Sequence, residues 1–266
     1  MTGVETDRKA DASYLAFHLW FIVPPILLLL LTMPRRQTSA NRWALGAIPL
    51  ITLVAVIYTT PWDNALVRMG IWSYGSDRVI GTIGYVPIEE YAFFILLPLL
   101  IGLWLYRIRS NVYWAQFERG PLRARLTVAV GALVISSGAV IAALRWESLT
   151  YLGFILGWAL PVVALQWVWG GGIFAGAARP IAIAVAVPTV YLWVADLIAI
   201  GLGIWEISPR YTTGIDPFGL PIEEAIFFLV INVMVVQGLI AVLWVSQHLP
   251  ERWRATPAKD RMATPP

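Results

Sequence analysis

Cysteine is absent from this 266-residue chain, and histidine and lysine are nearly so. Without cysteine the chain has no disulfide framework, no thiolate metal site and no cysteine nucleophile. The two histidines, His18 and His248, lie at opposite ends of the sequence and form no ligand pair, so we expect no metal site. Both lysines, Lys9 and Lys259, lie in the tails, which excludes a retinal Schiff base inside a helical bundle.

Charged residues are also scarce, at 13% of the chain, which is about half the usual share of roughly 25% in soluble proteins. Apolar residues make up 59%, above the roughly 45–50% of a soluble domain. This composition indicates an integral membrane protein. The basic excess is arginine in loops and tails, which favours a role in membrane orientation over nucleic-acid binding. Residues 1–13 are polar and mixed in charge, unlike a cleavable signal peptide.

Seven apolar runs are each long enough to cross a bilayer, which takes roughly 17–25 helical residues. They cover residues 14–32, 43–60, 88–106, 126–144, 149–169, 180–202 and 222–245. We therefore predict an all-α membrane protein with seven transmembrane helices. Only residues 145–148 separate the fourth run from the fifth, so a tight turn is expected between those two helices.

Basic residues are divided unevenly between the two sides of these spans. Thirteen of the 19 lie after spans one, three, five and seven. The other side holds Arg8, Lys9, Arg68, Arg78, Arg145 and Arg210. Because cytoplasmic loops carry the excess of positive charge, we predict a multi-pass protein of the cell membrane with its N-terminus outside and its C-terminus in the cytoplasm.

An acidic motif occurs twice, each time at the start of an apolar run. Residues 87–94 read PIEEYAFF, and residues 221–228 read PIEEAIFF. The similarity extends backwards at a constant spacing of 133 residues: Tyr58, Asp63, Gly70, Ile71 and Trp72 match Tyr191, Asp196, Gly203, Ile204 and Trp205. At this spacing spans one to three superpose on spans five to seven, and span four is left over.

We therefore predict two three-helix repeats, residues 1–120 and 148–266, joined by a linker transmembrane helix within residues 121–147. A unit of three spans ends on the side opposite to its start, so a direct repeat would be inverted. One extra span restores the side, which makes the two units parallel and relates them by a pseudo-twofold axis along the membrane normal. Both acidic motifs then enter from the outer face at the same depth, and one composite site is expected between them.

The candidate catalytic groups are the four glutamates Glu89, Glu90, Glu223 and Glu224. A carboxylate beside hydrocarbon is costly, and two matched copies favour a function over a plain helix start, which proline followed by glutamate would also explain. Adjacent glutamates point about 100° apart on a helix, so we expect one of each pair to face the bundle, and the sequence leaves open which one. A carboxyl kept from water favours its protonated form, which acts as a general acid.

Two tryptophans recur in register with the glutamates, and indole faces stabilise cations in a dry site. A protonated acid beside Trp72 and Trp205 suits protonation of an alkene, followed by carbocation chemistry on an apolar substrate held in the bilayer. Other aromatic side chains recur in the same way and are candidate substrate-binding residues: Tyr58, Tyr191, Phe94 and Phe228.

Asp63 and Asp196 come near the ends of spans two and six. They are either helix-end residues or functional ones, which would bond to the glutamates or remove the final proton. The two halves are not identical, because Ser73-Tyr74 in the first stands where Glu206-Ile207 stands in the second. We therefore expect Tyr74 and Glu206 to have roles that the halves do not share.

Motifs for common cofactors are missing from the sequence. There is no aspartate-rich metal motif, no phosphate loop and no dinucleotide-binding fingerprint after a strand. We therefore expect no cofactor.

With these residues the sequence resembles the membrane-integral lycopene cyclases of bacteria, archaea and fungi. The resemblance rests on the two Pro-Ile-Glu-Glu motifs, on Gly-Ile-Trp at 70–72 and 203–205, and on Asp63 and Asp196. It covers nearly the whole chain. Members of this family occur as two small subunits or as one fused chain, and this sequence resembles the fused arrangement.

The resemblance implies a lycopene β-cyclase, an isomerase that converts lycopene to β-carotene by way of γ-carotene. Protonation of a terminal double bond gives a cation, the ring closes, and proton loss sets the new double bond, so the reaction is redox-neutral. The implied partners are lycopene within the bilayer and the lipid itself, with other enzymes of carotenoid biosynthesis as candidates and no nucleic acid.

Two alternatives stay open from the sequence. A cyclase or hydratase that acts on a longer, C50-type carotenoid, or one that forms ε- or γ-rings, would differ only in where the proton or water goes. A proton-coupled small membrane transporter would also use parallel repeats with intramembrane carboxylates. Its site is expected near mid-membrane, whereas these carboxylates lie at one interface.

Overall fold

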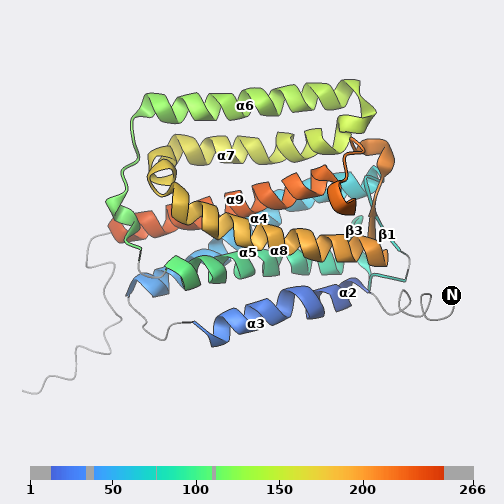
Figure 1. Cartoon of the computed structure of the whole chain (residues 1–266), viewed down its shortest axis with the longest axis horizontal. Coiled ribbons are helices and arrows are strands. Elements are labelled where there is room, and N and C mark those ends of the chain that lie inside the picture. Colours follow the sequence, from blue (N-terminus) through green and yellow to red (C-terminus); the bar gives the residue numbers. More distant parts are fainter. Residues whose placement is uncertain (1–12, 34–38, 76, 110–111, 249–266) are drawn as a thin grey trace, which may run out of the picture.

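The computed structural model describes residues 13–33, 39–75, 77–109 and 112–248 and contains a bundle of long helices that run side by side (Figure 1). Within the described residues, seven helical spans are long and apolar enough to cross a membrane, which confirms the predicted number. They are Tyr14–Leu31, Gly46–Arg68, Ile88–Ile108, Leu122–Arg145, Glu147–Gly176, Ala178–Leu202 and Ile222–His248. The charged residues of both tails, on which the predicted orientation partly rests, lie outside the described residues.

The first span is built from three segments: α2 (Tyr14–Phe17), the π-helical η1 (His18–Ile22) and α3 (Val23–Leu31). The other spans are single helices: α4 (Ser39–Arg68), α5 (Ile88–Arg109), α6 (Leu122–Arg145), α7 (Thr150–Gly176), α8 (Ala178–Leu202) and α9 (Ile222–His248). Helices α5 and α9, which begin with the two acidic motifs, are the most enclosed, with about half of each span buried.

Helix α4 runs further than the predicted span 43–60 and ends at Arg68. Polar side chains in its last turns bond within the helix: the Thr60 hydroxyl donates to the Val56 carbonyl and the Asn64 amide donates to the Thr60 carbonyl. The helix can therefore continue through a less apolar stretch. Asp63 consequently lies inside the helix and is fully buried, not at its end.

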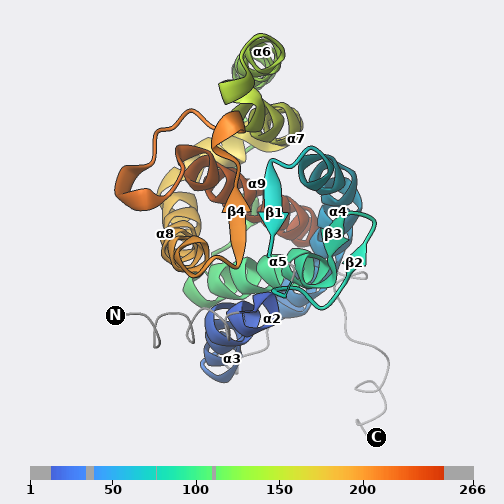
Figure 2. The same ribbon diagram turned by 90° about the vertical axis from the view of Figure 1, so that its right-hand side faces the viewer.

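Short strands join the helices at one end of the bundle, a feature that the all-α prediction did not include. β1 (Trp72–Tyr74) pairs antiparallel with β4 (Trp205–Ile207), and β2 (Thr82–Ile83) pairs with β3 (Val86–Pro87). Four short 3-10 turns complete the connections: η2 (Trp114–Gln116), η3 (Glu147–Leu149), η4 (Pro209–Tyr211) and η5 (Pro217–Gly219). Figure 2 shows β1 and β4 side by side over the end of the bundle.

The repeated Gly-Ile-Trp sequences explain how the chain leaves a helix and enters β1 or β4. Gly70 and Gly203 adopt φ values of +70° and +66°, a left-handed conformation that favours glycine and ends a helix. The next residue, Ile71 or Ile204, is fully buried, and its N–H bonds back to a carbonyl five residues earlier in the helix. The tryptophan that follows is then the first residue of the strand.

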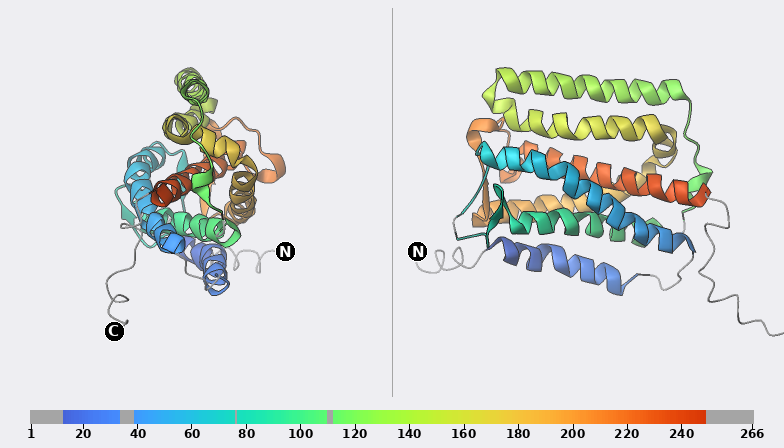
Figure 3. Two further views of the ribbon diagram at one scale, coloured as in Figure 1. Left: turned by 90° about the vertical axis from the view of Figure 1, so that its left-hand side faces the viewer. Right: turned by 180° about the vertical axis from the view of Figure 1, so that it is seen from behind.

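Helix α6 lies at the edge of the bundle and packs along α7, as Figure 3 shows from two further sides. The α6–α7 contact is close because α7 carries glycine there: a Cβ placed on Gly153 would come within 2.4 Å of the Ala143 Cβ. Only 11% of α6 is buried, so most of its surface faces outward. The predicted short turn between the fourth and fifth spans is confirmed, since α6 ends at Arg145 and η3 begins at Glu147.

Candidate functional site

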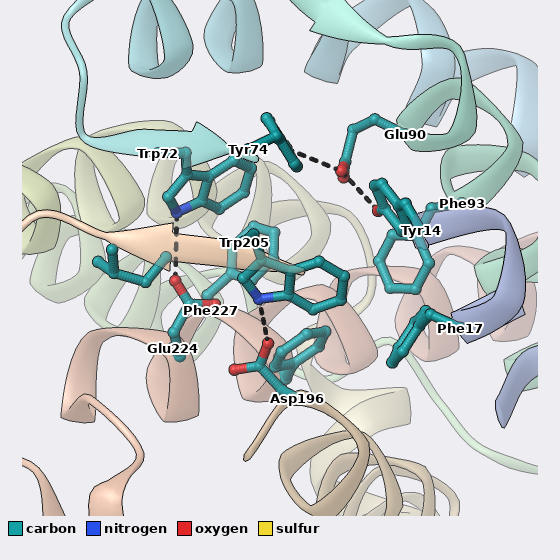
Figure 4. A pocket seen from close by; sticks show the side chains of 12 residues that line it. Tyr14, Phe17, Trp72, Tyr74, Glu90, Phe93, Asp196, Trp205, Glu224 and Phe227 are labelled. Atoms are coloured by element: carbon teal, nitrogen blue, oxygen red, sulfur yellow. Dashed lines mark hydrogen bonds between the residues drawn. The ribbon is translucent and has the colours of Figure 1, made fainter. Parts of the chain in front are cut away.

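A small pocket lies directly under the β1–β4 pair and brings together side chains from both halves of the chain (Figure 4). Its free volume is about 30 Å³, and apolar rings form most of its wall. The carboxyls in the wall come from both acidic motifs and from α8: Glu90, Glu224 and Asp196. Trp72, Tyr74 and Trp205 line the pocket from the strands above, and Tyr14 lines it from α2. Glu90 and Glu224 are 134 positions apart in the sequence.

Glu90 is held by two tyrosine hydroxyls. Tyr14 at the start of α2 donates to Glu90 Oε2 at 2.6 Å, and Tyr74 of β1 donates to the same oxygen at 3.1 Å. The two tyrosine rings stack with their centroids 5.9 Å apart. Burial, and then the neighbouring Glu90 carboxyl, raises the pKa of Tyr74, so this hydroxyl keeps its proton and serves as a donor.

Glu224 also accepts two hydrogen bonds on one oxygen, but its two donors come from different halves of the chain. The Tyr151 hydroxyl, at the start of α7, donates to Glu224 Oε1 at 2.6 Å. The indole Nε1 of Trp72 donates to the same oxygen at 3.2 Å. Each pocket glutamate thus accepts two hydrogen bonds on a single oxygen, and the described residues place none on its other oxygen.

The first glutamate of each motif points elsewhere. Glu89 Oε1 accepts a hydrogen bond from the Ile80 backbone N–H at 2.8 Å, and Glu223 Oε1 accepts one from the Thr213 backbone N–H at 2.7 Å. Both of these carboxyls fasten the loop that precedes their own helix. The sequence left open which glutamate of each pair faces the bundle. In both halves the second glutamate faces the pocket and the first holds a loop.

The two aspartates differ in position. Asp196 lines the pocket, where its Oδ1 accepts a hydrogen bond from Trp205 Nε1 at 2.9 Å and its buried Oδ2 has no partner among the described residues. Asp63 is also buried, and neither of its oxygens has a described partner, but it does not line the pocket. In the described part of the chain, no three His, Asp or Glu side chains gather so that they could hold a metal ion.

Aromatic rings enclose the carboxyls on most sides. The Trp205 ring packs against Tyr14 and Phe17 with centroids 5.0 and 4.9 Å apart. The Trp72 ring meets Phe227 edge-on at 5.4 Å. Phe93 of α5 and Phe228 of α9 complete the wall. A positive charge that forms in this pocket would face ring surfaces and three carboxyls.

Three of the predicted substrate-binding residues lie outside the pocket. The Tyr58 hydroxyl donates to the Trp158 carbonyl at 2.9 Å. The Tyr191 hydroxyl donates to the Phe21 carbonyl at 2.6 Å, a carbonyl that has lost its usual helical partner because residue 25 is proline. Phe94 packs edge-on against Tyr91, one turn earlier in α5, and does not line the pocket. The structure brings Trp72, Trp205 and Phe228 into the pocket but not these three.

Tyr14 and Tyr151, which hold the two pocket glutamates, are not among the predicted site residues. A signal for them exists: residues 13–17 read SYLAF and residues 150–154 read TYLGF. The spacing between these two segments is 137 residues, not the 133 or 134 of the other matches, so an alignment at constant spacing passes over them. Both tyrosines begin the first helix of their half, and both donate to the second glutamate of that half.

Comparison with known proteins places this chain in a family. A sequence model described as Lycopene cyclase matches residues 11–108 and 147–239. A lycopene beta-cyclase of Halobacterium salinarum is 42% identical over 91% of this chain and 99% of its own length. Bifunctional lycopene cyclase/phytoene synthases of Arthroderma gypseum and Sporisorium reilianum are 36% and 37% identical over 86% and 85% of this chain, and over 41% and 34% of their own lengths. No solved structure matches.

Proposed function

This chain belongs to the lycopene cyclase family and acts as a carotenoid cyclase in a membrane, and we propose that it is a β-cyclase that makes β-carotene from lycopene by way of γ-carotene. The β-ring is supported by the name of the Halobacterium relative. The observation that carries the proposed mechanism is the meeting of Glu90 and Glu224 in one aromatic pocket. These relatives give no support to a transporter.

The acid in this mechanism is a pocket glutamate that holds its proton. Burial among aromatic rings penalises the charged form of a carboxyl. In both Glu90 and Glu224, two donors converge on one oxygen, which suits the carbonyl oxygen of a protonated carboxyl. The other oxygen then carries the proton and is free to donate it to a terminal carbon–carbon double bond of the substrate.

Ring closure follows from that proton transfer without any oxidant or reductant. The protonated double bond becomes a cation, the neighbouring double bond attacks it to form the ring bond, and the positive charge moves to the ring. The faces of Trp72 and Trp205 stabilise the charge at each stage. Asp196, with one buried oxygen unpartnered, accepts the proton that leaves to form the ring double bond. One proton is consumed and one released, so the product is an isomer of the substrate.

One composite site serves both ends of lycopene in turn. Glu224 is held by Trp72 from the other half of the chain, so the two glutamate environments share parts. Glu90, Glu224 and Asp196 line the same pocket, which supports one reaction centre. Asp63 is buried and does not line the pocket, so this scheme gives it no direct contact with the substrate.

We also propose the two-repeat organisation, with units at 1–120 and 148–266 and a linker helix within 121–147. The pairing of β1 with β4 supports it: Trp72 faces Ile207, Ser73 faces Glu206 and Tyr74 faces Trp205, so equivalent positions exchange across a local twofold. The family match supports it as well, because its two segments, 11–108 and 147–239, leave out α6.

The orientation that we propose puts the N-terminus and the reaction pocket at the outer face of the cell membrane and the C-terminus in the cytoplasm. The support is the uneven distribution of arginine and lysine. Alkaline phosphatase fused after Gly75 should be active and fused after Gly120 inactive, because the enzyme folds only outside the cytoplasm. The reverse pattern would overturn the orientation and leave the chemistry untouched. We also propose other enzymes of carotenoid biosynthesis as candidate partners.

The experiment that tests the β-cyclase proposal is expression in a bacterium that accumulates lycopene, followed by chromatography of the pigments. We expect β-carotene, with γ-carotene as the one-ring intermediate. Uncyclised lycopene, with the protein present in the membrane fraction, would reject the proposal. Accumulation of ε-ring or hydrated products would reject the β-ring while keeping the proton-initiated chemistry.

A further inference from the structure

A larger hollow lies beside the reaction pocket, at the same end of the bundle. It is a groove of about 820 Å³ between α4, α6 and α7. Its floor and walls include Trp62 of α4, Val140 and Leu144 of α6, and Phe154 and Trp158 of α7. Charged side chains, from Arg145 and Glu147, occur only where α6 passes into η3. Val140 and Leu144 are 41% and 83% exposed, so the groove opens toward the surroundings of the bundle.

The reaction pocket alone is too small for the end of a carotenoid. Its 30 Å³ is about the space of one water molecule, whereas sites for organic ligands typically measure about 300–1,000 Å³. The groove falls within that range. A substrate end can therefore enter the pocket only after a side chain in the wall has moved, and the rest of the molecule needs a place outside it.

Stacked aromatic rings separate the groove from the pocket. Trp62, which lines the groove, stacks on Phe227, which lines the pocket, with centroids 5.6 Å apart and planes 12° apart. Trp62 also stacks on Trp158, at 4.6 Å and 21°, and the Trp158 and Phe227 centroids are 6.4 Å apart, so the three rings form one cluster. The indole N–H of Trp158 is buried and has no hydrogen-bond partner among the described residues, so stacking and packing alone hold that ring.

We propose that this groove binds the polyene chain of the substrate, and that the stack Trp62–Phe227 is the gate through which one end of the chain reaches the carboxyls. This inference rests on the proposed function. A flat conjugated chain matches a groove walled by indole and phenyl faces, and the stack forms the wall that the groove shares with the reaction pocket. Entry through this gate also fits the proposed cyclisation of the two ends in turn: after the first ring forms, the molecule withdraws and presents its other end.

The other apolar chain available in a membrane is a phospholipid tail, and a labelling experiment separates the two occupants. The natural chain has no cysteine, so single cysteines can be introduced without background. Val140→Cys places a thiol in the groove. Ile141→Cys places one at the adjacent position of α6, which is 54% exposed and does not line the groove.

Both variants are placed in phosphatidylcholine vesicles, with and without lycopene, and labelled with N-ethylmaleimide. We expect lycopene to slow labelling of Val140→Cys by about tenfold at about 90% occupancy, and to leave Ile141→Cys unchanged. Equal rates with and without lycopene at both positions would overturn the inference, because lipid tails or nothing would then occupy the groove. Slowing at both positions would overturn it too, since lycopene would then only change the bilayer.

A second pair of variants tests the groove through the reaction. Val140→Trp fills the groove, whereas Ile141→Trp adds the same volume to the outward face of α6. We expect Val140→Trp to raise KM for lycopene by about tenfold or more with a smaller change in kcat, and Ile141→Trp to behave as the natural protein. Equal KM values in the two variants would refute the groove. If the unmodified protein left lycopene uncyclised, the proposed function would fail, while protection of Val140→Cys would still report binding.

Discussion

The paired glutamates provide a test in which the control lies one residue away. Replacing Glu224 by Gln removes the proton donor but keeps an amide oxygen that can accept from the Tyr151 hydroxyl and the Trp72 indole at 2.6 and 3.2 Å. The pocket should therefore stay assembled. A positioned general acid contributes about 10²–10⁴-fold to a rate, so we expect cyclisation to fall by that factor, or by roughly 3–5 kcal/mol in the barrier.

The matched control is Glu223→Gln. Its amide oxygen can still accept from the Thr213 N–H, so a change in this one hydrogen bond costs at most about 1 kcal/mol of stability. We expect its cyclisation rate to fall less than about tenfold. The assay measures γ- and β-carotene formed from lycopene by purified protein in vesicles, with the amount of folded protein checked by its thermal transition. Equal losses in the two variants, or a larger loss for Glu223→Gln, would refute the assignment of the second glutamate to the pocket.

Other substitutions follow from the same contacts. Tyr151→Phe removes one hydrogen bond to a pocket carboxyl and should lower kcat by about three- to tenfold; no change would show that this contact does not position the acid. Asp196→Asn should lower ring formation by about 10²-fold or more, because an amide cannot take up the final proton, and full activity would exclude it as the base. Tyr58→Phe should keep kcat within about twofold, since its hydroxyl bonds to a carbonyl outside the pocket. Gly153→Val should lower the free energy of unfolding by about 1–3 kcal/mol, measured by denaturation in detergent, because its Cβ would come within 2.4 Å of Ala143 Cβ; an unchanged midpoint would contradict the close α6–α7 contact.

Much of the architecture follows from the apolar runs and the repeated motif. Bilayer thickness sets a length for each span, so seven runs predict seven helices, and the structure confirms that number. The motif also predicts that carboxyls from two distant segments share a site, since Glu90 and Glu224 recur with the same neighbours. The pocket contains both.

The details that depend on side-chain direction could not be read from the pattern. Adjacent glutamates differ by about 100° around a helix axis, and only the loop that bonds to Glu89 or Glu223 shows which one turns away from the pocket. Tyr58 and Tyr191 recur in register but serve backbone carbonyls. The strands β1 and β4 are three residues long, too short for an alternating pattern to reveal.

The central claim is that Glu90 and Glu224 belong to one site. The most direct test measures the rates of one-ring and two-ring product formation in Glu90→Gln and in Glu224→Gln separately. A single composite site predicts that each variant alone leaves lycopene almost wholly uncyclised at both ends, with losses of about 10²-fold or more. If each variant instead kept roughly half of the natural ring-closing rate, two independent sites would be present and the claim would be contradicted.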